Sequence, residues 1–466
     1  MAETVSQRST GRLSEFRRTL KNTGWQVAGQ FATMLSGIYA IRLIDPAAYG
    51  ALGAVTGLYA ILNQWIGVRS WETTVKFLAY YDRDDDRQRM ALIIRLGYTL
   101  DTAANLVCAL LMALGSKWLS SHVLHNPSQW SLVLLYSLVC IATIPIGTAS
   151  AILRVKQQFH SLFVIQSVTA LVRLLLIMST HWLPKDQRLA GIIGVTIITY
   201  AFESTTLWWL CRRAVGKLPR ARLGRESWNQ LRGARRNLAG TLMHSNVYGY
   251  LKPLYRGMDA ILVTRWSDTL AAGLFIAARK LSDVVTMLSS AMQTASGPIL
   301  PVLWSKGEYH KALRLTWRLA GAMALLTLVL GVLFMLVLPT FIHYWQPEYL
   351  PAMPPAQLMT ASGVLLSFTA PFYTLLVSCH KPWLATVAFA VTCFGQVVAL
   401  WLLVGLRPHR DIHQTAWSAA CAVFTASVLG ALAHVVCTLY AVRNAQRTAL
   451  STAQCSQPEL AEPSPS

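Results

Sequence analysis

The chain alternates long apolar stretches with short segments that carry most of its charged residues. A bilayer core about 30 Å thick needs about 20 mostly apolar residues per helix. Twelve stretches approach this length, six in the first half and six in the second. They cover residues 22–43, 49–71, 94–115, 129–152, 158–182, 190–211, 239–265, 270–300, 318–342, 355–379, 383–406 and 413–441. The pattern predicts an all-α integral membrane protein with twelve transmembrane helices.

An internal repeat relates the two halves, because a shift of 223 residues aligns them without a gap. The matched residues are Arg42 with Arg265, Asp45 with Asp268, Ala48 with Ala271, Gly50 with Gly273, Ala54 with Ala277, Leu58 with Leu281, Arg95 with Arg318 and Leu96 with Leu319. Parallel repeats related by an axis along the membrane normal build carriers whose substrate site lies between the repeats. We therefore expect two six-helix lobes arranged as a V-shaped, alternating-access transporter.

The polar segments set the expected domain boundaries. These are a basic cytoplasmic head at 1–21, an N-lobe at 22–211, a linker at 212–236, a C-lobe at 237–443 and a tail at 444–466. The tail is rich in Ser, Pro, Gln and Glu, and this composition predicts disorder. The linker has nine basic residues and one acidic residue. Such a segment suits anionic lipid headgroups, or docking of a cytoplasmic partner or a lipid pyrophosphate.

Lys and Arg lie mainly in the head, the linker, the tail and alternate loops, which all fall on one side of the predicted membrane. Basic residues close to a span end favour the cytoplasmic side. Both termini are therefore predicted to be cytoplasmic. The formal net charge of +21 is spread over these loops without a nucleic-acid-binding motif, so we expect no nucleic-acid partner.

Composition excludes a water-soluble enzyme, because 54% of residues are hydrophobic and only 13% are charged. The chain has no P-loop and no Gly-rich nucleotide fingerprint, so we expect no cofactor and no ATP hydrolysis. Almost all of the eight cysteines fall inside apolar spans. Cysteine behaves there as a small hydrophobic residue, and we expect neither disulfides nor a metal site.

Charged residues within the seventh span are the first candidates for a site. Lys252, Arg256 and Asp259 are spaced at i, i+4 and i+7, which would place them on one face of a continuous helix. Pro253 lies beside Lys252 and is expected to kink this helix. The three side chains are interpreted either as part of a polar cavity or as a structural set in which Arg256 pairs with Asp259.

The eighth span adds Arg279, Lys280 and Asp283. A charge held at the centre of a bilayer costs about 2.5–3.5 kcal/mol on insertion scales. These residues should therefore line a wet cavity or form ion pairs, and the pair expected from spacing is Arg279 with Asp283. Across both spans, the cationic residues are candidates for binding an anionic substrate, and Asp259 and Asp283 are candidates for ion coupling.

The first lobe contributes three further charged residues inside apolar spans, namely Arg173, Glu203 and Asp101. Arg173 is a candidate phosphate contact, or it has a structural partner such as Asp101. Glu203 or Asp101 could carry a coupling proton if removal from water favours its neutral form. An ion pair between Arg173 and Glu203 is a further alternative.

The segments around the repeated turn suggest a family. IRLIDPAAYGALGAVTGL resembles the "R-L-hydrophobic-x-P-x-x-Y/F-G" signature of lipid-linked polysaccharide flippases in the multidrug, oligosaccharidyl-lipid and polysaccharide exporter superfamily. MDAILVTRWSDTLAAGLFIAARKL and GPILPVLWSKGEYHKALR are similar to that family's second-lobe pattern and its proline-marked helix end. The second turn lacks the Pro and the aromatic residue of the first.

The resemblance implies a flippase, not an enzyme. It would export undecaprenyl-pyrophosphate-linked oligosaccharides across a bacterial inner membrane, for O-antigen, exopolysaccharide or capsule synthesis. A cationic cavity would bind the pyrophosphate, a glycosyltransferase would supply the substrate and a polymerase would consume it. One alternative is an ion-coupled drug or metabolite exporter of the same superfamily. Another is a membrane-embedded O-antigen polymerase or ligase, although the predicted outward loops are short.

Overall fold

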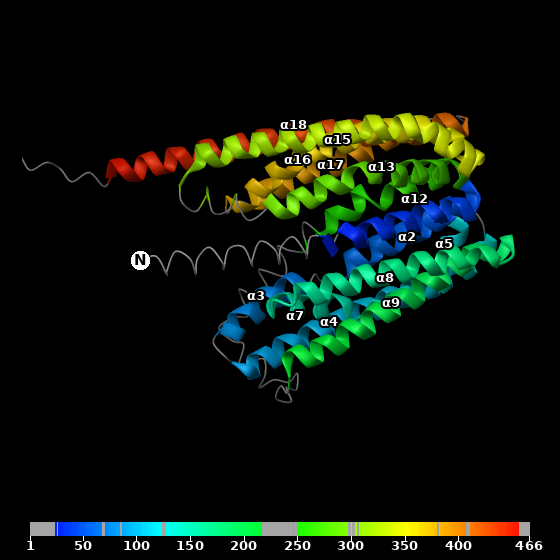
Figure 1. Ribbon diagram of the computed structural model, residues 1–466, viewed down its shortest axis with the longest axis horizontal. Coiled ribbons are helices and arrows are strands. Elements are labelled where there is room, and N and C mark those ends of the chain that lie inside the picture. The colour runs from blue at the N-terminus through cyan, green and yellow to red at the C-terminus, as the bar shows by residue number, and fades with distance from the viewer. Residues whose placement is uncertain are drawn as a thin grey trace, which may run out of the picture.

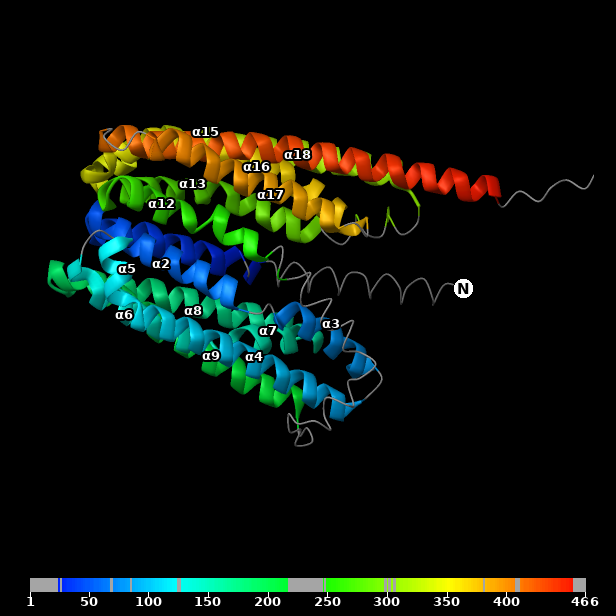
Figure 2. The same cartoon turned by 180° about the vertical axis from the view of Figure 1, so that it is seen from behind.

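The computed structural model describes residues 24–25, 27–67, 70–83, 86–123, 127–216, 246, 249–296, 300, 303–304, 307–379, 382–406 and 411–455. Every regular element within these ranges is helical. Two helical bundles form a V (Figures 1 and 2). We call the end at which the bundles meet the joined end, and the end toward which α18 extends the wide end. The expected all-α architecture with two lobes is confirmed.

The first bundle, or N-lobe, begins with a helical segment at 27–43. It continues with α2 (Pro46–Ile66), α4 (Arg87–Leu114), α6 (Trp130–Ala142), α7 (Ile146–Val155), α8 (Phe159–Ser179) and α9 (Lys185–Val215). Two connecting helices complete it: α3 (Ser70–Arg83) joins α2 to α4, and α5 (Ser116–His122) joins α4 to α6. The α3 helix lies at the wide end, and α5 lies near the joined end (Figure 1).

The second bundle, or C-lobe, begins with a helical segment at 249–255. It continues with α12 (Met258–Trp266), α13 (Thr269–Ser296), α15 (Tyr309–Trp345), α16 (Met353–Ser378), α17 (Pro382–Leu400) and α18 (Ile412–Cys455). A 3-10 turn, η3 (Pro347–Ala352), joins α15 to α16, and a π-helical turn at Trp401–Gly405 ends α17.

Eight helices of the described structure are long and apolar enough to cross a membrane. They are Arg87–Leu114, Trp130–Val155, Phe159–Trp182, Lys185–Val215, Tyr309–Trp345, Pro347–Val377, Trp383–Gly405 and Ile412–Arg447. The other four predicted spans correspond to segment 27–43, α2, the helices within 249–266, and α13. α2 packs directly against α12 and α13. Segment 27–43 and α13 contribute polar or charged side chains to a cavity, described below, and the helices within 249–266 are interrupted at residues 256–257.

The internal repeat explains how the lobes meet. Asp45 and Asp268 each cap the helix that follows, through carboxylate bonds from the amides of Ala48 (2.8 Å) and Ala271 (2.6 Å). One turn later α2 and α13 cross at Gly50 and Gly273. A Cβ at Gly50 would overlap the Thr269 carbonyl oxygen, and one at Gly273 would overlap the Pro46 carbonyl oxygen. The repeated Asp therefore caps the start of each central helix, and the repeated Gly allows the two helices to cross closely.

An apolar core fills the joined end around this crossing, and it draws residues from both lobes. Ile41, Ile44 and Tyr49 of the N-lobe pack with Phe275 and Tyr349 of the C-lobe. The Tyr349 hydroxyl donates to the Ile44 carbonyl oxygen at 3.1 Å, and its ring meets the Tyr49 ring edge-on at 6.3 Å. Burial of aromatic and aliphatic side chains on this scale stabilises contact between the lobes at this end.

Two predicted spans are broken. The stretch predicted at 129–152 is interrupted at residues 143–145, between α6 and α7, where Pro145 removes a backbone donor. The stretch predicted at 239–265 is interrupted at residues 256–257. Gly257 has φ 153° there, a backbone conformation favoured by glycine.

The chain ends also differ from expectation where they are described. α18 continues to Cys455, so the helix runs into the segment predicted as a disordered tail. The head at 1–21, most of the linker at 212–236 and the last residues, 456–466, lie outside the described residues. The predictions made for them stay predictions.

Candidate functional site

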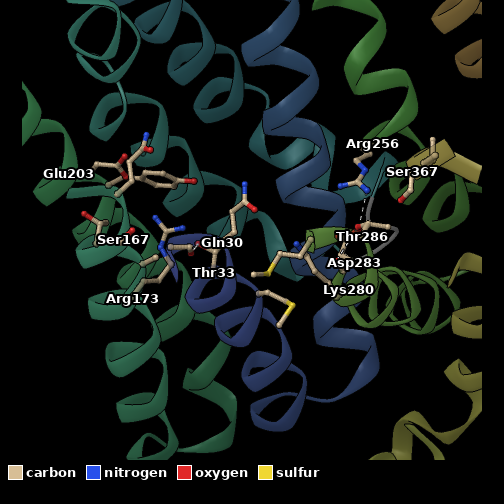
Figure 3. Close-up of a pocket in the computed structure, with 18 of the residues that line it drawn as sticks. Gln30, Thr33, Ser167, Arg173, Glu203, Arg256, Lys280, Asp283, Thr286 and Ser367 are labelled. Carbon is tan, nitrogen blue, oxygen red and sulfur yellow. Dashed lines mark hydrogen bonds and ion pairs between the residues drawn. The ribbon is translucent and has the colours of Figure 1, made fainter. Parts of the chain in front are cut away.

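A cavity of about 770 Å³ lies between the two lobes. Both lobes line it, and Figure 3 shows the charged residues of each wall directed toward the space between them. The N-lobe supplies residues of segment 27–43, α8 and α9, and the C-lobe supplies Arg256 and residues of α13 and α16. The lining is Gly29, Gln30, Thr33, Met34, Gln166, Ser167, Thr169, Ala170, Arg173, Tyr200, Glu203, Arg256, Lys280, Asp283, Thr286, Met287, Leu366, Ser367 and Ala370.

The cavity lies on the wide side of the glycine crossing. Its α13 residues run from Lys280 to Met287, which at about 1.5 Å per residue is roughly 10–20 Å along the helix from Gly273. The apolar core of the joined end surrounds the crossing and extends along α13 to Leu281, where the cavity begins. This layout closes the cavity toward the joined end.

An ion pair dominates the C-lobe wall. The Arg256 guanidinium lies 2.9 Å from the Asp283 carboxylate, with 52% and 25% of the two side chains exposed. Lys280, one turn before Asp283 on α13, also lines the cavity and is exposed to it. The Lys280 stem passes beside Gly37, where an added Cβ would lie 3.5 Å from Lys280 Cδ. Lys280 therefore reaches from the C-lobe across to segment 27–43.

A second ion pair, between α13 and α12, is buried. Arg279 contacts Asp259, and only 16% and 0% of their side chains are exposed. Gln396 of α17 donates to the Asp259 carboxylate at 3.2 Å and to the Tyr255 carbonyl oxygen at 3.1 Å. The Asp259 carboxylate also accepts the amides of Gly257 (3.1 Å) and Ala260 (2.8 Å). Neither member of this pair lines the cavity, and the arrangement fixes α12 against α13 and α17.

The pairing differs from the one that sequence spacing suggested. Arg256 pairs with Asp283 and Arg279 with Asp259, so both pairs join different helices. The expected shared face of Lys252, Arg256 and Asp259 is wrong, because the break at Arg256 and Gly257 interrupts the helix. Beyond the break Asp259 turns into the protein, while Arg256 lies in the cavity wall.

Arg173 and Glu203 are the charged residues of the N-lobe wall. The Arg173 guanidinium donates from Nε to the Thr199 hydroxyl at 3.1 Å and lies 4.4 Å from the centre of the Tyr200 ring. In the part of the chain that the structure describes, no ion pair joins Arg173 to Glu203. Cation–π contact with Tyr200 and the Thr199 hydroxyl hold the guanidinium in place without neutralising its charge.

Asp101 does not line this cavity. Its carboxylate accepts the backbone amide of Thr148 at 2.9 Å and the Thr148 hydroxyl at 2.7 Å. Thr148 lies in the first turn of α7, just after the break that follows α6. Amides in the first turn of a helix lack intrahelical partners, so Asp101 on α4 caps a helix that begins inside the bundle.

Of the predicted site residues, the structure brings Arg173, Glu203, Arg256, Lys280 and Asp283 together around one cavity. Lys252 is exposed but does not belong to the lining. The cavity wall thus carries three basic side chains and two carboxyl groups. The arrangement can bind an anion with hydrogen-bonding groups around it.

Sequence reasoning missed the uncharged polar residues of the wall. Gln166, Thr169 and Arg173 are spaced at i, i+3 and i+7 on α8, and Gln30 and Thr33 at i, i+3 on segment 27–43. Polar residues at helical spacing inside apolar spans mark one face of a helix. That periodicity was the available signal. Tyr200 carried no such signal, because aromatic residues also occur in cores and at membrane interfaces.

The chain is similar to a known protein family. The family described as "Polysaccharide biosynthesis protein" matches residues 19–304. No curated protein matches the chain.

Several solved structures share the fold. An inward-facing multidrug resistance MATE family transporter of the MOP superfamily is similar with a TM-score of 0.71 and 11% identity, over 91% of this chain and 99% of that chain. An outward-facing multidrug resistance MATE family transporter gives a TM-score of 0.67 and 10% identity, over 92% and 96% of the chains. The lipid II flippase MurJ in an inward closed conformation gives 0.63 and 11%, over 93% and 92%.

The match over residues 19–304 covers more than half of the chain. The fold similarity extends over nearly all of it. The chain is a multi-pass membrane protein that belongs to the polysaccharide biosynthesis protein family, and it has the fold of the flippases and transporters of the MOP superfamily.

Proposed function

We propose that this protein moves undecaprenyl-pyrophosphate-linked oligosaccharides across a bacterial inner membrane for the synthesis of a surface polysaccharide. The observation that carries the proposal is the charge of the shared cavity. Arg173, Arg256 and Lys280 outnumber the two carboxylates of its lining. A pyrophosphate group needs cationic partners when it leaves bulk water, because electrostatic interactions are less screened there.

The two walls suit different parts of such a substrate. Arg256 and Lys280 lie close together on the C-lobe side and can bind phosphate oxygens. The N-lobe wall carries Gln166, Ser167 and Tyr200 around Arg173. Amides and hydroxyls bind sugar hydroxyls by hydrogen bonds, and an aromatic ring packs on the apolar face of a sugar ring. We assign the pyrophosphate to the C-lobe wall and the oligosaccharide to the space beside the N-lobe wall.

Access to the cavity follows from the V shape. Lys76 of α3, Lys311 of α15 and Arg443 of α18 belong to the wide end. The bias of basic residues toward the cytoplasm makes the wide end cytoplasmic and the joined end external. The substrate would then enter from the cytoplasmic leaflet. Separation of α2 from α13 at the glycine crossing would open the cavity to the other side.

The test is transbilayer movement in proteoliposomes that contain the full chain and a fluorescent undecaprenyl-pyrophosphate oligosaccharide. The proposal predicts faster movement than in protein-free liposomes, and competition by unlabelled undecaprenyl-pyrophosphate oligosaccharide. A rate equal to that of protein-free liposomes, with the protein folded and oriented, would overturn the proposal.

Ion-coupled export of small molecules is a second candidate, and the position of Glu203 favours it. This carboxylate lines the same cavity as the aromatic ring of Tyr200, so it could bind a cationic drug or a coupling ion. The same proteoliposomes decide between the two. Efflux of a small cationic dye under a proton or sodium gradient that Glu203→Gln abolishes, without movement of the lipid-linked oligosaccharide, would favour the exporter.

A further inference from the structure

A second cavity of about 440 Å³ adjoins the charged one, and its lining is apolar. It lies between the lobes, with walls from segment 27–43 and α8 on one side and from α13 and α15 on the other. We call it the apolar groove. Its lining is Met34, Leu35, Ile38, Tyr39, Leu174, Met178, Leu281, Val284, Phe334, Val337, Leu338, Phe341 and Trp345.

The groove and the charged cavity are adjacent. Met34 lines both of them. On α13, Lys280 and Asp283 face the charged cavity, and the next residues, Leu281 and Val284, face the groove. Consecutive helical residues are about 100° apart around the axis, so α13 separates the two spaces by presenting a charged face to one and an apolar face to the other.

The other walls are equally regular. Phe334, Val337, Leu338 and Phe341 are spaced at i, i+3, i+4 and i+7 along α15, which places them on one helical face. At the rim, Val337 is 62% exposed and Met178 is 42% exposed. In a membrane protein such exposed apolar residues contact lipid, so the groove can open sideways into the bilayer.

We propose that this groove binds the first isoprene units of the prenyl chain attached to the pyrophosphate. This inference rests on the proposed function. The groove begins beside Lys280, whose stem crosses Gly37 of the opposite wall, so a chain leaving a phosphate held there would enter it directly. A membrane phospholipid fits less well, because its phosphate lies at the membrane surface while the groove starts inside the protein.

Recognition of the chain would make the protein selective for long polyprenyl carriers over free pyrophosphate or sugar phosphates. In a bilayer the prenyl chain leaves lipid and not water, so the gain on binding comes from van der Waals packing against the groove walls. Each additional isoprene unit held in the groove should therefore tighten binding. Units beyond the rim would stay in lipid and add little. Affinity should therefore rise over the first few isoprene units and then level off.

The first test uses purified full-length protein in lipid nanodiscs and three ligands, namely inorganic pyrophosphate, a two-isoprene pyrophosphate and undecaprenyl pyrophosphate. All three should bind, with affinity rising from the first to the last. Val284→Trp fills the groove and should weaken undecaprenyl pyrophosphate binding about tenfold while leaving inorganic pyrophosphate unchanged. Val332→Trp, at a 50% exposed position of α15 outside the groove, is the matched control and should change neither.

The outcomes separate the two proposals. If inorganic pyrophosphate and undecaprenyl pyrophosphate both fail to bind, the proposed function fails. If pyrophosphate binds but chain length and Val284→Trp have no effect, the proposed function stands and the groove inference is overturned.

A second test does not depend on a variant. A polyprenyl pyrophosphate with a photoreactive diazirine on its second isoprene unit should label Leu281, Phe334 or other groove residues in the unaltered protein. Excess undecaprenyl pyrophosphate should suppress the labelling. Labelling of the groove by a diazirine phospholipid that undecaprenyl pyrophosphate does not displace would show a membrane lipid as the occupant and overturn the inference.

Discussion

Gly50 and Gly273 face each other across the boundary between the lobes. Each glycine lies against the backbone of the opposite helix, one turn before the opposite glycine. The Cβ that Gly50 lacks would occupy the Thr269 carbonyl oxygen, and the one that Gly273 lacks would occupy the Pro46 carbonyl oxygen. Pro46 and Thr269 are themselves 223 residues apart. The contact is thus reciprocal: the 223-residue shift that relates the two repeats exchanges its two halves.

Substitution of Gly50 by Ala should open this contact. The added methyl group meets backbone on the opposite helix, and overpacking of this kind costs about 1–3 kcal/mol. The ratio of molecules with the joined end closed to those with it open should fall by about fivefold or more. Spin labels on the N-terminal ends of α2 and α13, at the joined end, read by pulsed electron paramagnetic resonance, would measure the separation.

Gly321→Ala is the matched control for this experiment, since nothing lies within 4 Å of a Cβ at that position of α15. It should leave the distance distribution unchanged. An unchanged distribution in Gly50→Ala as well would mean that the close approach does not hold the joined end together.

The ion pair between Arg256 and Asp283 should compete with the substrate. Asp283 forms an ion pair with the Arg256 guanidinium, which we assign to pyrophosphate binding, and both side chains are partly exposed. An exposed pair of this kind contributes about 1 kcal/mol or less. Asp283→Asn should therefore raise the affinity for inorganic pyrophosphate by up to about fivefold, as measured by isothermal titration calorimetry.

Asp82→Asn supplies the comparison, because Asp82 pairs with Lys156 at 2.6 Å outside the cavity lining. Its effect on pyrophosphate binding should be negligible. Weaker binding in Asp283→Asn would indicate that Asp283 positions Arg256 for the anion instead of competing with it.

The buried ion pair of Arg279 and Asp259 should stabilise the folded protein. Removal of one partner leaves the other charge uncompensated in the interior, which typically costs about 3–5 kcal/mol. Asp259→Asn should lower the thermal unfolding temperature in detergent markedly more than Asp283→Asn. The double variant Asp259→Asn with Arg279→Gln should recover part of the loss. Equal unfolding temperatures for the two single variants would contradict a structural role for the buried pair.

Asp101 should behave as a helix cap. Loss of a cap typically costs about 1 kcal/mol, so Asp101→Ala should destabilise the N-lobe, while Asp101→Asn keeps an acceptor for Thr148. Transport by Asp101→Asn should then retain any dependence on an imposed pH gradient. If Asp101→Asn abolishes that dependence and Glu203→Gln does not, Asp101 carries the coupling proton.

Much of the fold was predictable from the sequence because apolar length and the 223-residue repeat both constrain it. The repeat placed Asp45 with Asp268 and Gly50 with Gly273 before their roles were visible. The capping role follows from residue type, since Asp favours the position before a helix. The close approach at the glycines required the structure, because sequence spacing does not say which helices cross.

The candidate site was predicted in part. Charges inside apolar spans identified Arg173, Glu203, Arg256, Lys280 and Asp283, because such residues are costly in lipid and gather around polar spaces. The pairing was missed, because the break at Gly257 brings Asp259 to Arg279 of α13 and leaves Asp283 to pair with Arg256. Arg279 and Asp283 share a continuous helix, but spacing along one helix does not show which charges neighbouring segments present to it. The apolar groove cannot be predicted from the sequence, since residues that line a groove and residues that face lipid are equally apolar.

Lys280 links the charged cavity to the apolar groove, so the central claim can be tested at this residue. The rate of transbilayer movement of a fluorescent undecaprenyl-pyrophosphate oligosaccharide should be measured in proteoliposomes with Lys280→Ala, Lys280→Arg and the control Lys311→Ala. Lys311 pairs with Glu308 at 3.3 Å and its side chain is 72% exposed. We predict that Lys280→Ala loses most of the rate, that Lys280→Arg keeps much of it and that Lys311→Ala keeps all of it. A full rate in folded Lys280→Ala would contradict the account of a cationic cavity that binds the pyrophosphate.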